Sequence, residues 1–405
     1  MSSRTGRSSA RLAVTALVAL FSAGYLPAYL LPTVVGRLVT GFGLTTPQAG
    51  AVGSALLLAS AGTGLLLAGR VRAIGPVRLA RCGLGLLIVG ALLAAGATAL
   101  PQLLAGCLLT GVGAGTATAV AAVAVAGSAD PHRSSALGLL ATSCVAAALF
   151  LLLPRLGAGH PLPFAALAGW AALALLTVGR LTLDREPVRA RTRTRTVLPR
   201  RSAGLVLAGG MMLWSMAQNA LWGVSGQIGL GRVGLSEQTM GLVFALALAG
   251  GLLGVTVAGA VGARLGRALP IGVGTAVIAL CVLFTGGAES VGAFALGEVL
   301  WNTCYPLVLT YLIGLAATLD QGGRWAVLAG SASSLGVACG PAVGTALSAA
   351  AGYPAMGLTL GGLLATVAVP LVLVARQRPA ARVFVPAQRA AAEPSAVEYR
   401  ALSPR

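Results

Sequence analysis

One carboxylic acid stands apart because it lies inside an apolar run. The chain has nine acidic residues, and eight of them lie in polar segments or at the edges of apolar runs. Only Glu298 lies well inside such a run. A carboxyl group within a membrane costs on the order of 2–3 kcal/mol, so it marks a functional site by default. We predict that Glu298 takes up and releases a proton; the alternative is a protonated acid with a structural hydrogen bond.

Aromatic and amide side chains share a predicted helical face with this acid. Trp301, Asn302 and Tyr305 follow the acid at i+3, i+4 and i+7, spacings that bring side chains to one side of an α-helix. Two more apolar runs carry similar faces, namely Trp214, Gln218, Trp222 and Ser225 in one run and Ser22, Tyr25, Tyr29 and Thr33 in the other. We predict that these faces line one cavity for a small molecule. The alternative is that the rings anchor helices at a membrane interface.

Metal, redox and nucleotide chemistry are not indicated. The six cysteines lie in apolar runs without a C-x-x-C pair, so we interpret them as small buried hydrophobic residues. The two histidines, His132 and His160, fall in predicted loops, and no metal site can be assembled from them. A nucleotide-binding P-loop requires lysine, which this sequence lacks. We therefore expect no metal, no cofactor and no catalytic residues.

The elements that must position these residues are membrane-spanning helices. Hydrophobic residues make up 57% of the 405 residues and charged residues 9%, and the mean hydropathy is +0.90. A bilayer core of ~30 Å needs about 20 apolar residues per helix, and only helices or closed barrels pair their backbone groups internally. Twelve runs suit such helices, at 12–39, 48–69, 79–98, 101–127, 135–153, 163–181, 203–230, 239–262, 269–286, 291–318, 326–351 and 354–375. The first run is too long for a signal peptide, so we interpret it as a span.

The arginines predict the orientation of these helices. A net charge of +19 would suit a nucleic-acid-binding protein, but the basic residues are all arginines in short segments between apolar runs, so we exclude that partner. With both termini in the cytoplasm, the inner segments hold 25 arginines and the outer ones three, which fits the positive-inside rule. The outer three are Arg37, Arg155 and Arg232. We interpret Arg37 and Arg155 as snorkelling side chains; the alternative for Arg37 is contact with an anionic substrate.

An internal repeat divides the chain into two halves. Residues 191 positions apart correspond, as Leu12 does to Ala203 and Gly75 to Gly266. A repeat in the same direction implies two six-helix bundles related by a pseudo-two-fold axis along the membrane normal. The predicted segments are a cytoplasmic N-terminus at 1–11, six-helix halves at 12–181 and 203–375, a basic cytoplasmic linker at 182–202 and a disordered cytoplasmic tail at 376–405.

Glycines at four-residue spacing predict close packing between helices. Gly336, Gly340 and Gly344 form such a stripe in the eleventh run. We expect Gly340 to tolerate substitution far less well than Gly352, which lies just beyond the outer end of the same run.

The loop after the eighth run resembles a motif of the major facilitator superfamily. The segment 259–267, GAVGARLGR, is similar to the family's G-x-L-a-D-R-x-G-R-R, with alanine in place of the acid. The corresponding loop of the first half also lacks the acid. The resemblance implies that loops with Gly75, Arg264, Gly266 and Arg267 take part in gating on the cytoplasmic side.

The fourth run resembles the drug/proton antiporter branch of the same family. The segment 107–113, CLLTGVG, is similar to the R-x-x-x-G-x-G motif of that branch, with Cys107 in place of the arginine. The offset of 191 makes Glu298 the counterpart of Cys107. In the family, the first, fourth, seventh and tenth helices line the central path, and the predicted polar faces occur on three of these four.

These observations together predict a secondary active transporter. We expect the two halves to rock about a central site and to move a small, partly apolar or aromatic compound across the cytoplasmic membrane, as a proton-coupled antiporter for efflux. The alternative is a uniporter or an uptake permease for a small metabolite. An enzyme would need a cluster of polar groups, and a receptor would usually need a large soluble domain. The expected partners are the substrate, the lipid bilayer and protons, and we expect a monomer.

Overall fold

The computed structural model describes residues 2–157, 159–181, 198–262, 264–320 and 323–377. Most of the predicted basic linker and nearly all of the predicted tail lie outside these residues. The part of the chain that the structure describes consists of helices, turns and loops without a β-strand. This agrees with the prediction of an all-helical protein.

The first half of the chain begins with a helix that is interrupted at Leu30. The two pieces are α1 (Ser2–Tyr29) and α2 (Leu31–Thr40). Pro27 and Pro32 flank the interruption, and each removes a backbone donor that a continuous helix would use. The other helices of this half are α3 (Thr46–Leu67), the single-turn α4 (Val71–Ile74), α5 (Pro76–Ala95), α6 (Leu100–Ala126), α7 (Pro131–Leu156) and α8 (Pro161–Thr177).

Local sequence signals explain where these helices begin. Thr45 and Gln48 form a capping box at the start of α3. Asp130 caps α7 by accepting a hydrogen bond of 2.9 Å from the backbone N–H of Arg133. Proline stands at the first positions of α3, α5, α6, α7 and α8, where its missing N–H costs nothing.

The second half contains the longest helix of the described chain. Its elements are α9 (Arg201–Gln227), a π-helical turn (Ile228–Arg232), α10 (Glu237–Val261), α11 (Ala268–Gly286), α12 (Val291–Leu319) and α13 (Arg324–Arg376). α13 extends over 53 residues, but Gly352 has φ 79° and ψ 167°, so α13 consists of two arms that meet there. Because a residue with a side chain is strained at this φ, substitution of Gly352 carries a backbone cost that the comparison with Gly340 did not include.

Ten helices among the described residues are long and apolar enough to cross a membrane. α13 counts once in this number, and α9 is not part of it. The finding supports a multi-pass membrane protein. The count of twelve spans and the symmetry of two bundles stay predictions.

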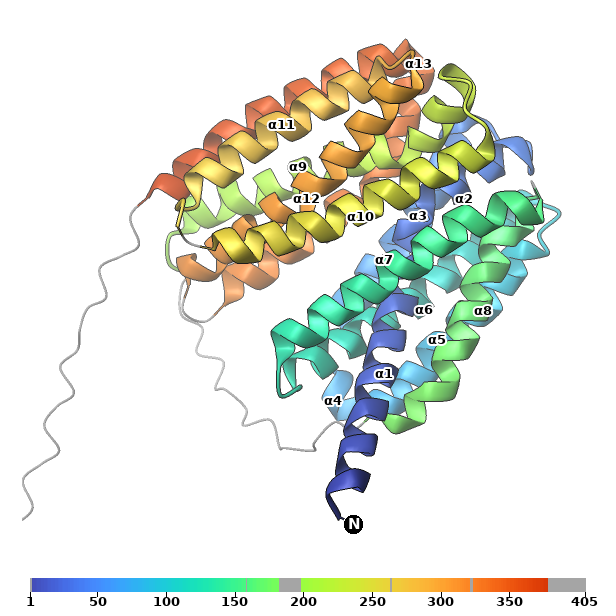
Figure 1. The fold of residues 1–405 in the computed structure, drawn as a ribbon, viewed down its shortest axis with the longest axis vertical. Coiled ribbons are helices and arrows are strands. Elements are labelled where there is room, and N and C mark those ends of the chain that lie inside the picture. Colours follow the sequence, from blue (N-terminus) through green and yellow to red (C-terminus); the bar gives the residue numbers. More distant parts are fainter. Residues whose placement is uncertain (1, 158, 182–197, 263, 321–322, 378–405) are drawn as a thin grey trace, which may run out of the picture.

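Helices pack mainly against others of the same half (Figure 1). In the second half, α13 lies along α9 and α11, and α10 lies along α12. In the first half, α6 packs against α3 and α5, and α1 against α7. A Cβ atom at Gly336 or Gly344 would overlap the backbone oxygen of Met212 or Ala220, so the glycine stripe of α13 provides the close approach to α9. The close-packing prediction is confirmed for this stripe.

The two halves meet through α2 with α9, α3 with α13, and α7 with α10. We call the helix ends near Leu181 and Arg201 the linker end, and the ends near Thr40 and Glu237 the far end. In Figure 1 the first and second halves diverge toward the linker end. The contacts between the halves therefore concentrate toward the far end.

Two hydrogen bonds join backbone and side chains across this interface. Trp222 Nε1 on α9 donates to the carbonyl oxygen of Ala28 on α1 over 3.2 Å. The backbone N–H of Ala342 on α13 donates to Ser54 Oγ on α3 over 2.9 Å. All four residues lie in the far-end portion of their helices, so the halves are held together there.

Candidate functional site

Glu298 lies fully buried between α12 and α9. Ser225 on α9 donates its hydroxyl to Glu298 Oε1 over 2.5 Å. The second carboxyl oxygen, Oε2, is buried and has no hydrogen-bond partner among the described residues. None of the ion pairs between described residues includes Glu298. An ionised carboxylate would be a buried charge with a single neutral donor, so this position is suited to take up a proton.

One further side-chain hydrogen bond joins α12 to α9 beside the acid, and two others lie within a single helix. Trp301 Nε1 donates to Gln218 Oε1 over 3.1 Å. The Gln218 amide donates to the carbonyl oxygen of Trp214, also over 3.1 Å. Asn302 donates to the backbone oxygen of Glu298 over 3.1 Å. These bonds give the Trp301 indole and the amides of Gln218 and Asn302 partners inside the second half, whereas Trp214 Nε1, like Glu298 Oε2, is buried without a hydrogen-bond partner among the described residues.

Aromatic rings form a continuous row along the same two helices. Trp214 and Tyr305 stack with their ring centroids 5.3 Å apart and an interplanar angle of 9°. The ring centroids of Tyr305 and Trp301 are 6.2 Å apart, and those of Trp301 and Trp222 are 5.5 Å apart. Trp222 continues the row to Phe244 of α10, at 5.1 Å. The row is a mostly buried aromatic layer that reaches Phe150 of α7 at the contact between the halves.

The predicted cavity residues fall into two groups by exposure. Tyr25 is 40% exposed, and the side chains of Tyr29, Asn302 and Tyr305 are partly exposed. The buried group consists of Trp214, Gln218, Trp222 and Trp301. In this conformation only the first group can contact a molecule between the halves, and the second group lies behind it. The assignment of all eight as cavity residues stays a prediction.

The predicted gating-loop residues lie at the linker end. Gly75 has φ 105° and Gly266 has φ 66°, so both loops need glycine for a left-handed backbone. Arg264 is exposed. Arg267 Nη1 donates to Thr318 Oγ1 of α12 over 3.1 Å. Both loops thus contain a glycine with a positive φ, while their gating role stays a prediction.

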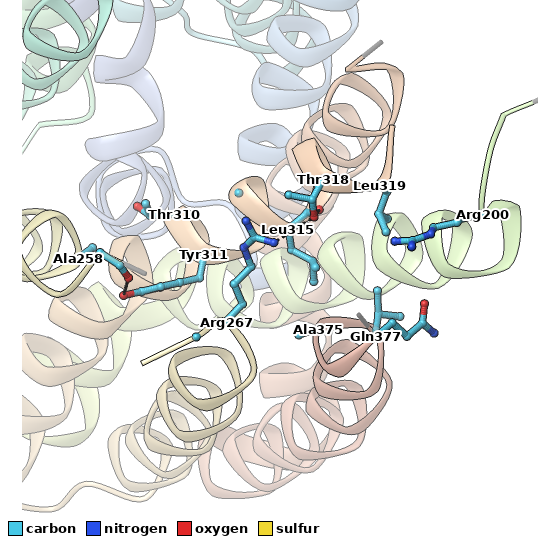
Figure 2. A pocket seen from close by; sticks show the side chains of 14 residues that line it. Arg200, Ala258, Arg267, Thr310, Tyr311, Leu315, Thr318, Leu319, Ala375 and Gln377 are labelled. Carbon is cyan, nitrogen blue, oxygen red and sulfur yellow. Dashed lines mark hydrogen bonds between the residues drawn. The ribbon is translucent and has the colours of Figure 1, made fainter. Parts of the chain in front are cut away.

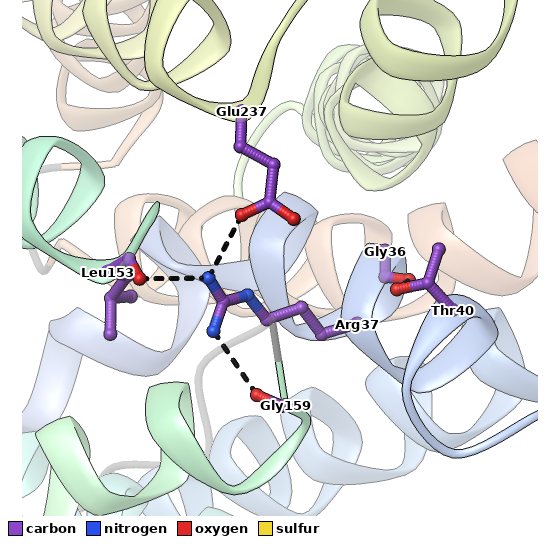
Figure 3. Close-up of polar contacts among 6 residues, drawn as sticks. All are labelled: Gly36, Arg37, Thr40, Leu153, Gly159 and Glu237. Carbon is purple, nitrogen blue, oxygen red and sulfur yellow. Dashed lines mark hydrogen bonds and ion pairs between the residues drawn. The ribbon is translucent and has the colours of Figure 1, made fainter. Parts of the chain in front are cut away.

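Arg37 differs from its interpretation as a snorkelling residue. Its side chain is only 7% exposed and lies between α2, α7 and α10 (Figure 3). The guanidinium donates to the carbonyl oxygens of Leu153, at 3.1 Å, and Gly159, at 3.2 Å. It also pairs with Glu237 at 3.3 Å. Snorkelling fails because carbonyl groups at the C-terminal end of α7, where the helix dipole favours a cation, lie within reach inside the protein.

The pair Arg37–Glu237, which we call the far-end ion pair, joins the two halves. Beside it lies a cavity of about 390 Å³, lined by residues of α2, α7 and α10 that include Phe150 and Phe244. Sequence reasoning missed this pair, because Glu237 lies at the start of α10 and Arg37 lies 200 residues earlier. The available signal was that Arg37 is one of only three arginines predicted on the outer side.

No metal centre is indicated within the described residues. They contain no group of three or more histidine, cysteine, aspartate or glutamate side chains that could hold a metal ion. Around Glu298 the chemistry is thus that of a fully buried acid, amide groups and aromatic rings.

A family model described as Major Facilitator Superfamily matches residues 12–319. No curated protein matches the sequence. The match covers most of the described first half and the second half through α12.

Several solved transporter structures are similar to this one. A human organic anion transporter has 19% sequence identity and a TM-score of 0.65, and the match covers 89% of this chain and 99% of that chain. A D-xylose–proton symporter has 17% identity and a TM-score of 0.66, covering 89% and 96%. A POT family transporter in complex with 5-aminolevulinic acid has 14% identity and a TM-score of 0.72, covering 90% and 96%. These likenesses show the fold.

Proposed function

Because the chain belongs to the Major Facilitator Superfamily, we propose that it is a secondary active transporter that exports a small, partly apolar or aromatic compound by proton antiport. The family and the similar structures make the chain a transporter of small molecules and not an enzyme. The observation that carries the proposal is the buried Glu298, hydrogen-bonded to Ser225 within a row of aromatic rings.

Twelve spans are the topology that we propose. α9 has 27 residues, enough to cross a membrane, and the two arms of α13 meet at Gly352. Adding α9 to the ten apolar helices and counting the arms separately brings the number to twelve. An even number of spans returns both termini to one side, as the arginine distribution requires.

The linker end is proposed to face the cytoplasm. Ser202 is exposed at the start of α9. In a cysteine-free background, Ser202→Cys should react only with a membrane-permeant thiol reagent when it is added to intact cells. Gln238→Cys, exposed at the far end, should react with an impermeant reagent. The opposite pattern would contradict the proposed orientation.

Alternating access is supported by the unequal contacts between the halves. Hydrogen bonds and the far-end ion pair hold the far ends together, while Tyr25, in the middle of its span, remains 40% exposed. We take this conformation as open toward the cytoplasm. Breaking the far-end contacts and forming new contacts at the linker end would expose Tyr25 to the opposite side of the membrane.

The proton and the substrate would use the same region of α9 and α12. A proton on Glu298 removes a buried charge, and its release toward one side of the membrane restores that charge. Tyr305 and Asn302 lie on the acid's own helix and are partly exposed, and Asn302 donates to the backbone oxygen of Glu298. A compound that stacks on the rings can therefore respond to the protonation of Glu298. The similar structures transport an organic anion or a sugar, or bind 5-aminolevulinic acid, so the fold by itself suits several substrate classes.

The test is transport by Glu298→Gln in proteoliposomes, with ethidium as the fluorescent aromatic probe. Glutamine keeps the shape and the hydrogen bonding of the side chain but cannot release a proton. We expect this variant to fold and to exchange probe by counterflow, yet to lose accumulation driven by an imposed pH gradient.

The matched control is Glu289→Gln, an exposed acid that pairs with Arg232 and should retain full accumulation. If Glu298→Gln kept gradient-driven accumulation, Glu298 would be structural and a uniporter or an uptake permease would be the better proposal. Loss of counterflow together with accumulation would place the residue in substrate binding instead of proton coupling.

A further inference from the structure

A second cavity holds two arginines that the proposed transport site does not use. Its volume is about 400 Å³, and it lies at the linker end of the second half. Arg200 reaches it from the start of α9, and Arg267 from the loop before α11 (Figure 2). None of the described residues that line it is acidic. The described polar lining of the cavity thus includes two guanidinium groups.

Arg267 crosses from its loop toward α12. Figure 2 shows the guanidinium pointing at Thr318, to which Nη1 donates over 3.1 Å. A guanidinium has five N–H donors, and this bond uses one of them. The side chain is partly buried. It is thus held in position with donors directed toward the cavity.

Arg200 is the one described residue other than glycine with a positive φ. Its backbone has φ 50° and ψ 47°. Such a conformation is uncommon for a residue with a side chain, and it persists where the surrounding structure requires it. In Figure 2 the side chain points toward Leu319 and Gln377, on the cavity's side of α9. The backbone conformation thus directs a second guanidinium to the same space.

The remaining wall of the cavity is apolar. Tyr311, Leu315, Leu319 and Val374 line it with buried side chains. The Tyr311 hydroxyl donates to the carbonyl oxygen of Gly262 over 2.7 Å, so its ring presents carbon atoms to the cavity. The complementary molecule has an anionic group joined to an apolar chain.

We propose that this cavity binds the phosphate headgroup of an anionic phospholipid, with an acyl chain against the apolar wall. A planar guanidinium matches the geometry of a phosphate through paired N–H donors. Basic pockets between transmembrane helices at the cytoplasmic surface suit such headgroups, because that leaflet is anionic. The choice of leaflet rests on the proposed orientation of the linker end. A bound headgroup joins the α10–α11 loop to the start of α9.

The test compares two double variants that remove the same charge. Arg200→Gln with Arg267→Gln alters the cavity, and Arg72→Gln with Arg78→Gln alters exposed residues at the linker end of the first half. The purified full-length proteins are titrated in detergent with phosphatidylglycerol or phosphatidylcholine, and bound lipid is counted by native mass spectrometry. The wild type should prefer phosphatidylglycerol. The cavity variant should lose on the order of tenfold in affinity for it, and the control should keep it.

Several outcomes would overturn the proposal. Equal losses in the two double variants would mean that general surface charge attracts the lipid. Displacement of phosphatidylglycerol by millimolar inorganic phosphate would identify a soluble anion as the ligand. The thermal unfolding midpoint in phosphatidylcholine checks that each variant is folded, and the two single variants replace the double variant if it is not. Lipid binding is measured without substrate or pH gradient, so it can fail independently of the proposed transport function.

Discussion

At the scale of single residues, Ser225 has two acceptors for one hydroxyl proton. Its Oγ lies 2.5 Å from Glu298 Oε1 and 3.0 Å from the carbonyl oxygen of Leu221. A hydroxyl donates to one of these at a time. When Glu298 is ionised, Ser225 can donate to the carboxylate. When Glu298 is protonated, the acid can donate to Ser225, which then donates to Leu221. Glu298 Oε1 thus has Ser225 as a hydrogen-bond partner in both protonation states.

Ser225→Ala should weaken proton coupling without abolishing binding of the probe. Among the described residues, the substitution removes the one side-chain donor to the carboxylate, and a hydrogen bond to a charged group contributes about 1.5–3 kcal/mol. We expect gradient-driven accumulation of ethidium in proteoliposomes to fall about tenfold or more.

Ser215→Ala is the matched control on the same helix. Ser215 is also buried, but its hydroxyl lies 2.6 Å from that of Ser333 on α13 and not near the acid. It should lower stability and leave the response to a pH gradient in place. Equal loss of coupling in both variants would show that the effect comes from packing of α9.

At the scale of elements, the contact of α9 with α13 depends on glycine. A Cβ atom at Gly340 would lie 2.7 Å from the Cβ atom of Asn219 and 2.8 Å from the backbone nitrogen of Ala220. A side chain there would push against backbone, which cannot move without shifting the helix. The two helices approach closely because the stripe has no side chains.

Gly340→Leu should lower the free energy of unfolding by roughly 1–3 kcal/mol or more, because overpacking usually costs that much. Gly362→Leu on the other arm of α13 is the control, because no atom lies within 4 Å of its Cβ position. The measurement is the thermal unfolding midpoint in detergent. Similar midpoints for the two variants would contradict the close-packing argument. Gly352 is unsuitable as a control, since its φ of 79° makes any side chain strained.

At the scale of the whole molecule, the far-end ion pair links the two halves in the conformation that the structure describes. Arg37 on α2 and Glu237 on α10 can remain 3.3 Å apart only while the far ends are closed. The carbonyl oxygens of Leu153 and Gly159 hold Arg37 within the first half. The bond to Glu237 is therefore the one that opening must break.

Glu237→Gln should shift the conformational equilibrium toward an open far end. The pair contributes roughly 1 kcal/mol, because Glu237 is 40% exposed and partly screened by solvent. Such a change alters the ratio of the two conformations about fivefold. Spin labels at the exposed Thr40 and Gln238 should show a larger long-distance population by double electron–electron resonance.

Glu289→Gln is the control for this measurement, because its pair with Arg232 lies within the second half. A charge swap of Arg37 and Glu237 should not restore closure, since the carbonyl oxygens around position 37 accept hydrogen bonds and would repel a carboxylate. An unchanged distance distribution in Glu237→Gln would mean that the pair does not hold the halves together.

The sequence by itself determined the features that depend on neighbouring residues. Apolar runs of sufficient length, with proline and glycine between them, predicted the helices and most of their boundaries, because helix formation and termination are local. Gly75 and Gly266 were recognised as equivalent loop positions, and both need a left-handed backbone. Glu298 was identified from the contrast with its apolar surroundings, which requires no knowledge of the fold.

Only the tertiary structure decided which distant residues meet. Ser225 was predicted on a polar face, but its contact with Glu298 depends on the register between α9 and α12. Trp214 and Gln218 share that face yet are buried, and Tyr305 and Trp301 of α12 contact them. Arg37 pairs with Glu237 across the two halves, where sequence reasoning predicted contact with the membrane surface. Helical periodicity orients a side chain around its own axis, whereas its partner is set by how separate helices pack.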